Sequence, residues 1–228
     1  MARKQFLIIG MGILGQSVAK TLSSEGAEVI AVDQSPLLVD QVKDFVEVAV
    51  QVDATDKKAL EQLGVNKVDA AIVCIGEDFN SAILTVANLI DLGVNHVKAR
   101  ANAEMEHKIL SRIGADEVFF VEIEMGKNIA HKLAEPTVVD EMDVCNGYKI
   151  VQWVSHQKMA GHTLQELALP TKHRVYVVGI RKTVDGKSHV EPATRETKID
   201  EGDLLILSGH EKDLSLFLQS WKKGSPNG

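Results

Sequence analysis

The first 130 residues of the chain alternate short apolar runs with segments of helical periodicity. Six runs rich in Val, Ile, Leu and Ala predict strands: Gln5–Gly10, Glu28–Val32, Glu47–Val52, Ala70–Ile75, His96–Ala99 and Glu117–Phe120. Helical patterns follow them: Leu14–Ser24, Pro36–Phe45, Lys57–Leu63, Asn80–Leu92, Glu104–Arg112 and Glu124–Leu133. Near-continuous apolar runs are typical of parallel strands covered on both faces. The alternation therefore predicts an α/β fold, a Rossmann-like doubly wound parallel sheet.

The pattern changes after Pro136, where we expect the first domain, residues 1–136, to end. An acidic segment of mixed pattern, residues 137–146, is expected to be a linker. Residues 147–222 then have β-rich segments, a turn signal at Asp185-Gly186 and a last helix over Glu211–Gln219, which predict a small α+β domain. The polar residues 223–228 are expected to form a flexible tail.

The stretch GMGILG joins the first expected strand to the first helix. Gly10 permits a tight turn, Gly12 lets backbone approach a phosphate, and Gly15 lets the helix pack on the strand. The N–H groups and dipole at the helix start favour an anion there. Because the motif joins a strand to a helix, Gly10–Gly15, including Met11, Ile13 and Leu14, are candidate cofactor-binding residues.

Asp33 ends the second expected strand, at the spacing of a ribose-binding acid. A carboxylate there accepts from ribose hydroxyls and repels a 2′-phosphate, which favours NAD, ATP, ADP or AMP over NADP. Gln34 is included in the candidate site. The alternative is a glycine turn that binds nothing.

Further candidates follow the next strands, because ligands of such sheets bind beyond the carboxyl ends of the strands. Asp53, Ala54 and Thr55 are expected near an adenine ring, although Asp53 has an alternative role as a helix cap. Cys74-Ile75-Gly76 is expected to approach the ribose, with Cys74 more typical of a core thiol than of a nucleophile. Lys98 and Arg100 offer positive charge to phosphates, unless they are ordinary solvated side chains.

No set of catalytic residues accompanies this site. The eight histidines are scattered, and the chain has neither a P-loop nor a nucleophile elbow. The net charge of −7, with no basic stretch, argues against nonspecific nucleic-acid binding. The two cysteines, far apart in sequence, indicate a reducing compartment. These observations favour a sensor over an enzyme, with a small NAD-dependent oxidoreductase as the alternative.

Nothing in the sequence predicts a membrane span or a signal peptide. No run of about 18 apolar residues occurs, and Met1-Ala2-Arg3-Lys4 leads directly into a strand-like segment. We therefore expect a cytoplasmic protein.

Several motifs resemble the cytosolic regulatory subunits of bacterial potassium-uptake systems, the TrkA/KtrA-type proteins with RCK domains. The most specific is Ile109–Asp116, which resembles the family's L-x-x-[IL]-G-A-D before its last Rossmann strand. Glu122–Gly126 resembles the entry to a dimer-forming helix, with Val121 in place of a proline. Gly161–Leu167 and Asp200–Gly209 resemble the TrkA-C (RCK-C) domain. The resemblance covers nearly the whole chain.

The resemblance implies a regulatory protein that pairs into dimers and assembles a tetrameric or octameric ring. Such a ring docks at the inner face of the cell membrane on an integral-membrane, potassium-translocating subunit. It binds an adenine nucleotide (NAD, NADH, ATP or ADP), which biases the ring between shapes. A regulator of a different membrane transporter is a third interpretation.

The resemblance leaves the choice of ligand open at two positions. Ile13 stands where KtrA-like members often have an arginine near the terminal phosphates, so we expect ATP and ADP to bind with similar affinity. Glu122 matches a position where some members hold a divalent or monovalent cation at the dimer interface. Its alternative role is a helix-starting acid favoured by the helix dipole. Residues 169–174 show no copy of the cyclic di-AMP motif that some members carry.

Overall fold

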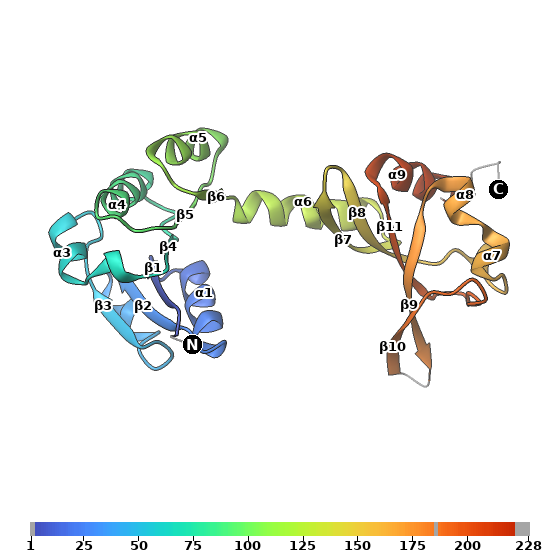
Figure 1. Cartoon of the computed structure of the whole chain (residues 1–228), viewed down its shortest axis with the longest axis horizontal. Helices are drawn as coiled ribbons and strands as arrows, with labels where there is room; N and C mark the ends of the chain where they lie inside the picture. The colour runs from blue at the N-terminus through green and yellow to red at the C-terminus, as the bar shows by residue number, and fades with distance from the viewer. Residues whose placement is uncertain (1–2, 185–186, 222–228) are drawn as a thin grey trace. The chain divides into compact units, whose positions relative to one another are not determined.

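The computed structural model describes residues 3–184 and 187–221 of the chain. It contains two compact units, one up to Gly126 and one from Lys127 onward (Figure 1). The turn expected at Asp185-Gly186 and the tail expected at residues 223–228 lie outside the described residues.

The N-terminal unit is built on a six-stranded parallel sheet, as the sequence predicts. Its strands are β1 (Gln5–Ile9), β2 (Glu28–Asp33), β3 (Val48–Gln51), β4 (Ala70–Val73), β5 (Val97–Arg100) and β6 (Glu117–Phe119). Their order is β3-β2-β1-β4-β5-β6, and every pair is parallel. The chain therefore reverses direction across the sheet beside β1 and β4, which is the switch point where doubly wound folds bind ligands.

Helices cover both faces of this sheet, which explains the near-continuous apolar strands. The helices are α1 (Ile13–Ser24), α2 (Pro36–Asp40), α3 (Lys57–Gln62), α4 (Phe79–Asp91), α5 (Glu104–Ile113) and a 3₁₀ turn over Val65–Lys67. One core cluster joins the sheet to α1 and α2, and a second joins it to α3, α4 and α5. Alternate residues of β1 divide between them: Leu7 and Ile9 face one cluster, and Ile8 faces the other.

Helix α2 is shorter than the sequence pattern indicates. The expected helix runs to Phe45, but α2 ends at Asp40. The following residues continue as turns, in which the Phe45 N–H donates to the Val42 carbonyl at 2.9 Å. Only Val42 in this stretch is fully buried, so the apolar face needed to stabilise another helical turn is missing.

Helix α6 (Val121–Ala134) crosses the division between the units and leads into an antiparallel sheet. The sheet order is β10-β9-β11-β8-β7. Its strands are β7 (Val138–Cys145), β8 (Tyr148–Val154), β9 (Tyr176–Val184), β10 (Lys187–Pro192) and β11 (Leu204–His210). The helical elements are α7 (Leu164–Leu167), α8 (Leu169–His173), α9 (Glu211–Ser220) and a 3₁₀ turn over Gln157–Met159. Buried Trp153, Leu207 and Phe217 belong to the core of this unit.

Residues 137–146, expected to be a linker, instead contain the edge strand β7. It pairs with β8 from Val138↔Trp153 to Cys145↔Tyr148, with two register shifts. Val138 is the only fully buried residue of β7. An edge strand with almost no buried side chains lacks the alternating apolar pattern from which a strand is predicted.

None of the described helices combines the length and hydropathy that a membrane crossing requires.

Candidate functional site

A cleft of about 900 Å³ lies in the N-terminal unit, where the strands of the parallel sheet end. The volume is at the upper end of the range of about 300–1,000 Å³ that is usual for small-molecule sites. Its lining comes from the residues after β1, β2, β3, β4 and β5 and from the starts of α1, α4 and α6. The cleft therefore coincides with the switch point of the sheet.

The glycine loop occupies one wall of this cleft. Gly10 has φ +91°, and a Cβ there would lie 3.1 Å from the backbone of Cys74, so the turn requires glycine. A Cβ at Gly15 would lie 1.8 Å from the Gly10 carbonyl oxygen. At Gly12, the N-cap of α1, a Cβ would meet nothing within 4 Å, because this position faces the open cleft.

The start of α1 is suited to bind a phosphate group. Gly12 has no side chain to cap the helix, and the first N–H groups of a helix have no acceptor within it. These N–H groups and the helix dipole favour an anion at this position. The motif residues Gly12, Ile13 and Leu14 all line the cleft.

Asp33 connects the glycine loop to the end of β2. Its Oδ2 accepts from the Met11 N–H at 2.6 Å, and its Oδ1 accepts from the Ser35 N–H at 2.7 Å. Each carboxylate oxygen has a second acceptor site, so the half-buried Asp33 can hold the loop and still accept from a ribose hydroxyl. Because the Met11 N–H already donates to Asp33, it is not free to bind a phosphate.

The loop after β3 supplies Asp53, Ala54 and Thr55 to the cleft. Asp53 Oδ1 accepts from the Thr55 hydroxyl at 2.7 Å and from the Thr55 N–H at 2.9 Å, which lowers the pKa of Asp53. The Asn88 amide of α4 donates to the Thr55 carbonyl at 2.9 Å and fixes the loop. Asp56, rather than Asp53, caps α3. The helix-cap alternative for Asp53 is therefore wrong.

Arg100, at the end of β5, is the cation of this site. Its guanidinium packs against Gly76, where a Cβ would lie 2.5 Å from Nη1, and its Nη2 pairs with the Glu122 carboxylate near the start of α6. The side chain of Arg100 is 20% exposed, whereas that of Glu122 is 62% exposed. Arg100 Nε is buried and has no partner among the described residues.

Cys74 contributes a buried thiol to the cleft floor, next to Gly10. Burial raises the pKa of this thiol to about 12, against the opposing effect of the Arg100 charge. The thiol is therefore protonated at neutral pH and is a poor nucleophile.

The structure brings together most of the candidate residues predicted from the sequence, but three of them do not line the cleft. Lys98 lies two residues before the end of β5, and its amine pairs with Glu117 on β6. Met11 is fully buried and contacts the core. Gly15 packs behind Gly10. The expectations that Lys98 supplies phosphate charge and that Met11 and Gly15 contact a ligand directly are thus not supported by the geometry.

Sequence reasoning missed part of the lining. The missed residues with polar side chains are Ser17, Ser35, Glu77, Asp78, Ser81 and Thr85, and the apolar ones are Ile9, Leu38, Val52 and Val121. Asp78 caps α4 by accepting from the Asn80 and Ser81 N–H groups. A cap signal directly after the fourth strand is visible in the sequence and places the start of α4 at the cleft.

The metal-ligand candidate Glu122 has one recorded partner, Arg100. Across residues 3–184 and 187–221, no group of three or more His, Cys, Asp or Glu side chains is arranged to hold a metal ion. A cation at Glu122 would therefore need ligands from outside this group of residues.

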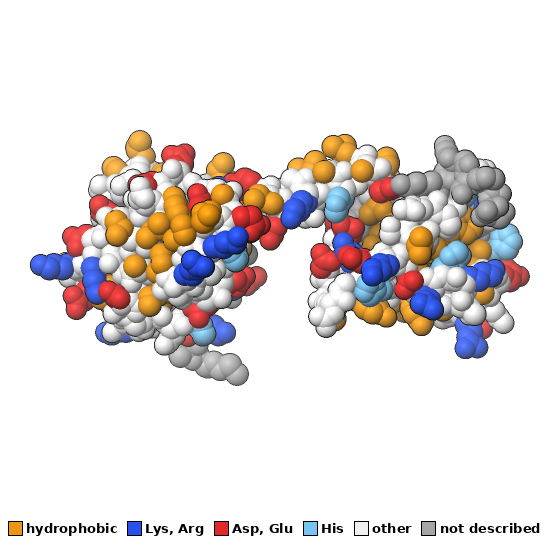
Figure 2. Space-filling view, turned by 90° about the horizontal axis from the view of Figure 1, so that it is seen from above, with side chains coloured by type: hydrophobic (Ala, Val, Ile, Leu, Met, Phe, Trp, Pro, Cys, Tyr) orange, Lys and Arg blue, Asp and Glu red, His pale blue; other side chains and the backbone are white. Residues whose placement is uncertain are grey.

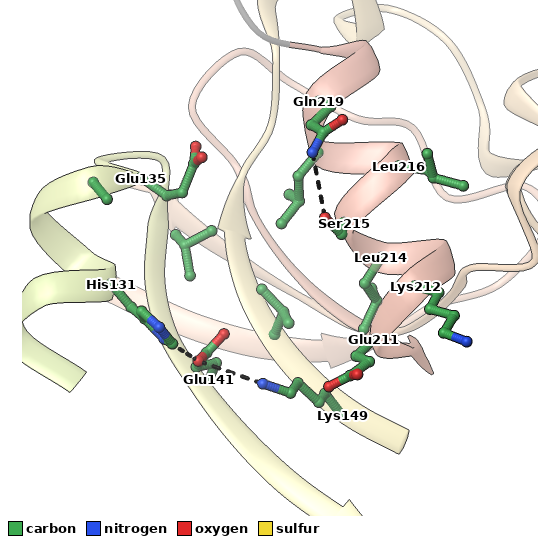
Figure 3. A pocket seen from close by; sticks show the side chains of 14 residues that line it. His131, Glu135, Glu141, Lys149, Glu211, Lys212, Leu214, Ser215, Leu216 and Gln219 are labelled. Atoms are coloured by element: carbon green, nitrogen blue, oxygen red, sulfur yellow. Dashed lines mark hydrogen bonds and ion pairs between the residues drawn. The ribbon is translucent and has the colours of Figure 1, made fainter. Parts of the chain in front are cut away.

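A second cavity, of about 810 Å³, lies in the C-terminal unit between the end of α6, β7, β8 and α9. Figure 3 shows His131 and Lys149 pointing toward Glu141, at 2.8 Å and 3.7 Å from its Oε1. Leu214 and Val151 belong to the apolar part of the lining. The described lining carries three carboxylates and two lysines, a formal charge of only −1 with His131 neutral, so the cavity has no strong preference for an anion or a cation.

Comparison with known proteins identifies both halves of the chain. A TrkA-N domain model matches residues 6–121, and a TrkA-C domain model matches residues 151–220. The Ktr system potassium uptake protein C of Bacillus subtilis is 34% identical over 94% of this chain and 96% of its own length. The Ktr system potassium uptake protein A of Vibrio alginolyticus is 30% identical over 95% of this chain and 97% of its own length.

Solved structures support the same relationship. The GsuK RCK domain is 26% identical over 95% of this chain and 46% of that chain, with a TM-score of 0.51. The GsuK channel bound to NAD is 25% identical over 96% of this chain, with a TM-score of 0.52. This chain spans less than half the length of these solved chains. With a TrkA-N domain followed by a TrkA-C domain, and similarity to the Ktr proteins over nearly its full length, the chain belongs to the TrkA/Ktr family of RCK-domain proteins.

Proposed function

We propose that this chain is a nucleotide-sensing regulatory subunit of a potassium transporter or channel. The observation that carries the proposal is a glycine loop and an uncapped helix start that face an open cleft in a chain of the TrkA/Ktr family. The relatives named as potassium uptake proteins match over nearly their full length. The NAD-bound GsuK channel supports an adenine nucleotide as the ligand.

In this proposal each wall of the cleft binds one part of the nucleotide. The N–H groups at Gly12, Ile13 and Leu14 hold phosphate, with Gly10 shaping the turn. Asp33 and Gln34 face the ribose. Asp53, Ala54 and Thr55 lie along the adenine, and Cys74, Ile75 and Gly76 form the floor. Arg100 and Glu122 complete the phosphate end. NAD, NADH, ADP and ATP share the adenosine group that these residues recognise.

Regulation follows from the position of the Arg100–Glu122 pair. Glu122 lies in the first turn of α6, the helix that continues into the C-terminal unit. A phosphate that competes for Arg100 releases Glu122 and changes the environment of that turn. A ligand shifts the equilibrium between two shapes only by its difference in affinity for them. A difference in affinity can arise at the Arg100–Glu122 pair, if a ligand's phosphate competes for Arg100 in one shape more than in the other.

The proposal includes assembly and location. The chain pairs with a second copy, forms a ring of four or eight chains, and docks on an integral-membrane potassium-translocating partner from the cytoplasmic side. It regulates this partner without turning over a substrate. The cleft would also suit a small NAD-dependent oxidoreductase, so enzymatic turnover is the outcome that the experiment must exclude.

The test uses a variant that fills the phosphate position while keeping the fold. Gly12→Asp places a favourable N-cap side chain at the start of α1 and puts a carboxylate where phosphate would bind. In the native host, deletion of the gene should reduce uptake of rubidium, a tracer for potassium. Wild-type protein should restore uptake, whereas Gly12→Asp should not. The matched control is Asn66→Asp, which adds the same charge at an exposed position in the 3₁₀ turn over Val65–Lys67 and does not line the cleft.

Two results would contradict the proposal. One is full restoration of uptake by Gly12→Asp protein that calorimetry shows to have lost nucleotide binding. The other is steady oxidation of NADH by the purified wild-type chain with a small carbonyl substrate, combined with normal rubidium uptake in the deletion strain.

A further inference from the structure

The cleft of the N-terminal unit is strongly acidic for a site that faces phosphates. The described residues that line it include five carboxylates and one cation, a formal charge of −4. The carboxylates are Asp33, Asp53, Glu77, Asp78 and Glu122, and the cation is Arg100. Most of these residues lie at the ends of strands or the starts of helices, where a ligand would pass close to them.

Local hydrogen bonds keep two of these carboxylates ionised. Hydrogen bonds from Thr55 lower the pKa of Asp53, and hydrogen bonds from Ser81 lower the pKa of Asp78. These two carboxylates therefore contribute negative charge to the cleft at neutral pH.

The positive charge nearby is already engaged. Arg100 pairs with Glu122, and Lys98 pairs with Glu117 outside the cleft. Within the described lining, attraction for phosphate comes mainly from the N–H groups at the start of α1. This attraction is local and acts within the first turn of the helix.

An apolar side chain stands at the same helix start. Ile13, the first residue of α1, is 94% exposed and lines the cleft. Leu14 and Val121 also belong to the lining. An additional phosphate would gain nothing from these side chains, whereas the ring of a second nucleoside can cover them.

We propose that this cleft selects against terminal phosphates and takes a dinucleotide, of the NAD class, in preference to ATP. The inference rests on the proposed nucleotide-binding function and names its ligand. A terminal phosphate carries a charge of about −1.5 to −2 near pH 7, and a dinucleotide has none. Charges within a Debye length of about 10 Å are poorly screened, so the carboxylates of the cleft repel ATP more strongly than NAD.

Calorimetric titration of the full chain with NAD, ADP and ATP in metal-free buffer tests the inference. At low salt we expect ATP to bind at least about tenfold more weakly than NAD, with ADP close to ATP because both carry a terminal phosphate. Raising NaCl from about 20 to about 200 mM should strengthen ATP binding several-fold, because salt screens repulsion. Added Mg²⁺ should strengthen ATP binding for the same reason and leave NAD nearly unchanged.

A charge-removing variant tests the cause. Glu77→Gln takes one negative charge from the cleft wall without removing any recorded hydrogen bond, and should bring the ATP affinity closer to that of NAD by about two- to fivefold. Glu61→Gln removes an exposed carboxylate on α3 that does not line the cleft, and should leave the ratio unchanged. An equal shift in both variants would show a general charge effect and overturn the assignment to the cleft.

The outcomes separate the inference from the proposed function. ATP binding as tight as NAD at low salt, or ATP binding that weakens as salt rises, overturns the selectivity while the nucleotide-binding function stands. Failure of all three nucleotides to bind a folded chain overturns both.

Discussion

Gly12 and Gly15 belong to the same motif but have different physical roles, which single methyl groups can separate. Gly15→Ala places Cβ 1.8 Å from the Gly10 carbonyl oxygen, so the loop must move. We expect a loss of unfolding free energy at the upper end of about 1–3 kcal/mol. Gly12→Ala meets no atom within 4 Å and should cost only about 0.5–1 kcal/mol, because alanine is a poorer N-cap residue than glycine.

The two substitutions should also differ in their effect on nucleotide binding, where Gly12→Ala has the larger effect for its small loss of stability. Gly12→Ala should weaken NAD binding about tenfold, since its methyl group occupies the approach to the helix N–H groups. Urea denaturation and calorimetry measure the two quantities. Equal stability of both variants would contradict the assigned role of Gly15.

The buried thiol of Cys74 predicts a pH dependence of stability. Its pKa is raised from 9.0 to about 12 in the folded chain. A group with a raised folded pKa stabilises the fold fully below the unfolded value, and this contribution is lost as pH rises from about 9 toward 12. At pH 10.5 we expect a loss of about 2 kcal/mol relative to pH 8. Cys74→Ala should remove this loss.

Exposed Cys145 provides the matched control for Cys74. Cys145→Ala should leave the alkaline loss of stability unchanged, and denaturant unfolding at pH 8 and pH 10.5 compares the three proteins. Thiol labelling at pH 8 should modify Cys145 in the native chain and Cys74 only after unfolding. Rapid native labelling of both residues would contradict the burial of Cys74.

At the scale of elements, α6 presents an apolar stripe to its surroundings. Met125, Ile129 and Leu133 are spaced four residues apart and are 56%, 53% and 77% exposed. Hydrophobic side chains also lie among charged ones at the surface of both units (Figure 2). A helix stripe of this kind is typical of a surface that binds another protein.

The stripe predicts that self-association depends on α6. Ile129→Glu should leave the secondary structure unchanged and shift the chain from dimer to monomer, because a charge would then be buried at the interface. Asn128→Glu, on the same helix and exposed, adds the same charge outside the stripe and should remain dimeric. Sedimentation velocity measures both variants. An unchanged mass for Ile129→Glu would show that another surface makes the dimer.

The elements of the N-terminal unit could be predicted because their stability comes from patterns visible in one segment at a time. Buried strands such as β1 and β2 are continuously apolar, and Gly114 ends α5 in the left-handed conformation. Edge strand β7 could not be predicted, since its stability comes from pairing with β8. The engagement of Lys98 by Glu117 depends on the register between β5 and β6. Neither the pairing of β7 with β8 nor that of Lys98 with Glu117 can be predicted from spacing along the sequence.

At the scale of the whole molecule, each unit has its own hydrophobic core and its own cavity. The chain thus combines an N-terminal unit that holds the candidate cleft with a C-terminal unit, and helix α6 runs from one unit into the other. A ligand in the cleft can act on the C-terminal unit only through an element that contacts the ligand and continues into that unit. The first turn of α6, which carries Glu122, is the part of that connection that lies in the cleft.

The central claim is that an oligomer of this chain holds an adenine nucleotide in its N-terminal cleft. Native mass spectrometry of the chain purified from its host, with millimolar NAD, ADP or ATP added in turn, measures oligomer mass and bound ligand together. We predict a dimer or larger ring that carries one adenine nucleotide per chain, and a Gly12→Asp oligomer that carries none. A folded monomer that stays unliganded with every nucleotide would contradict the account.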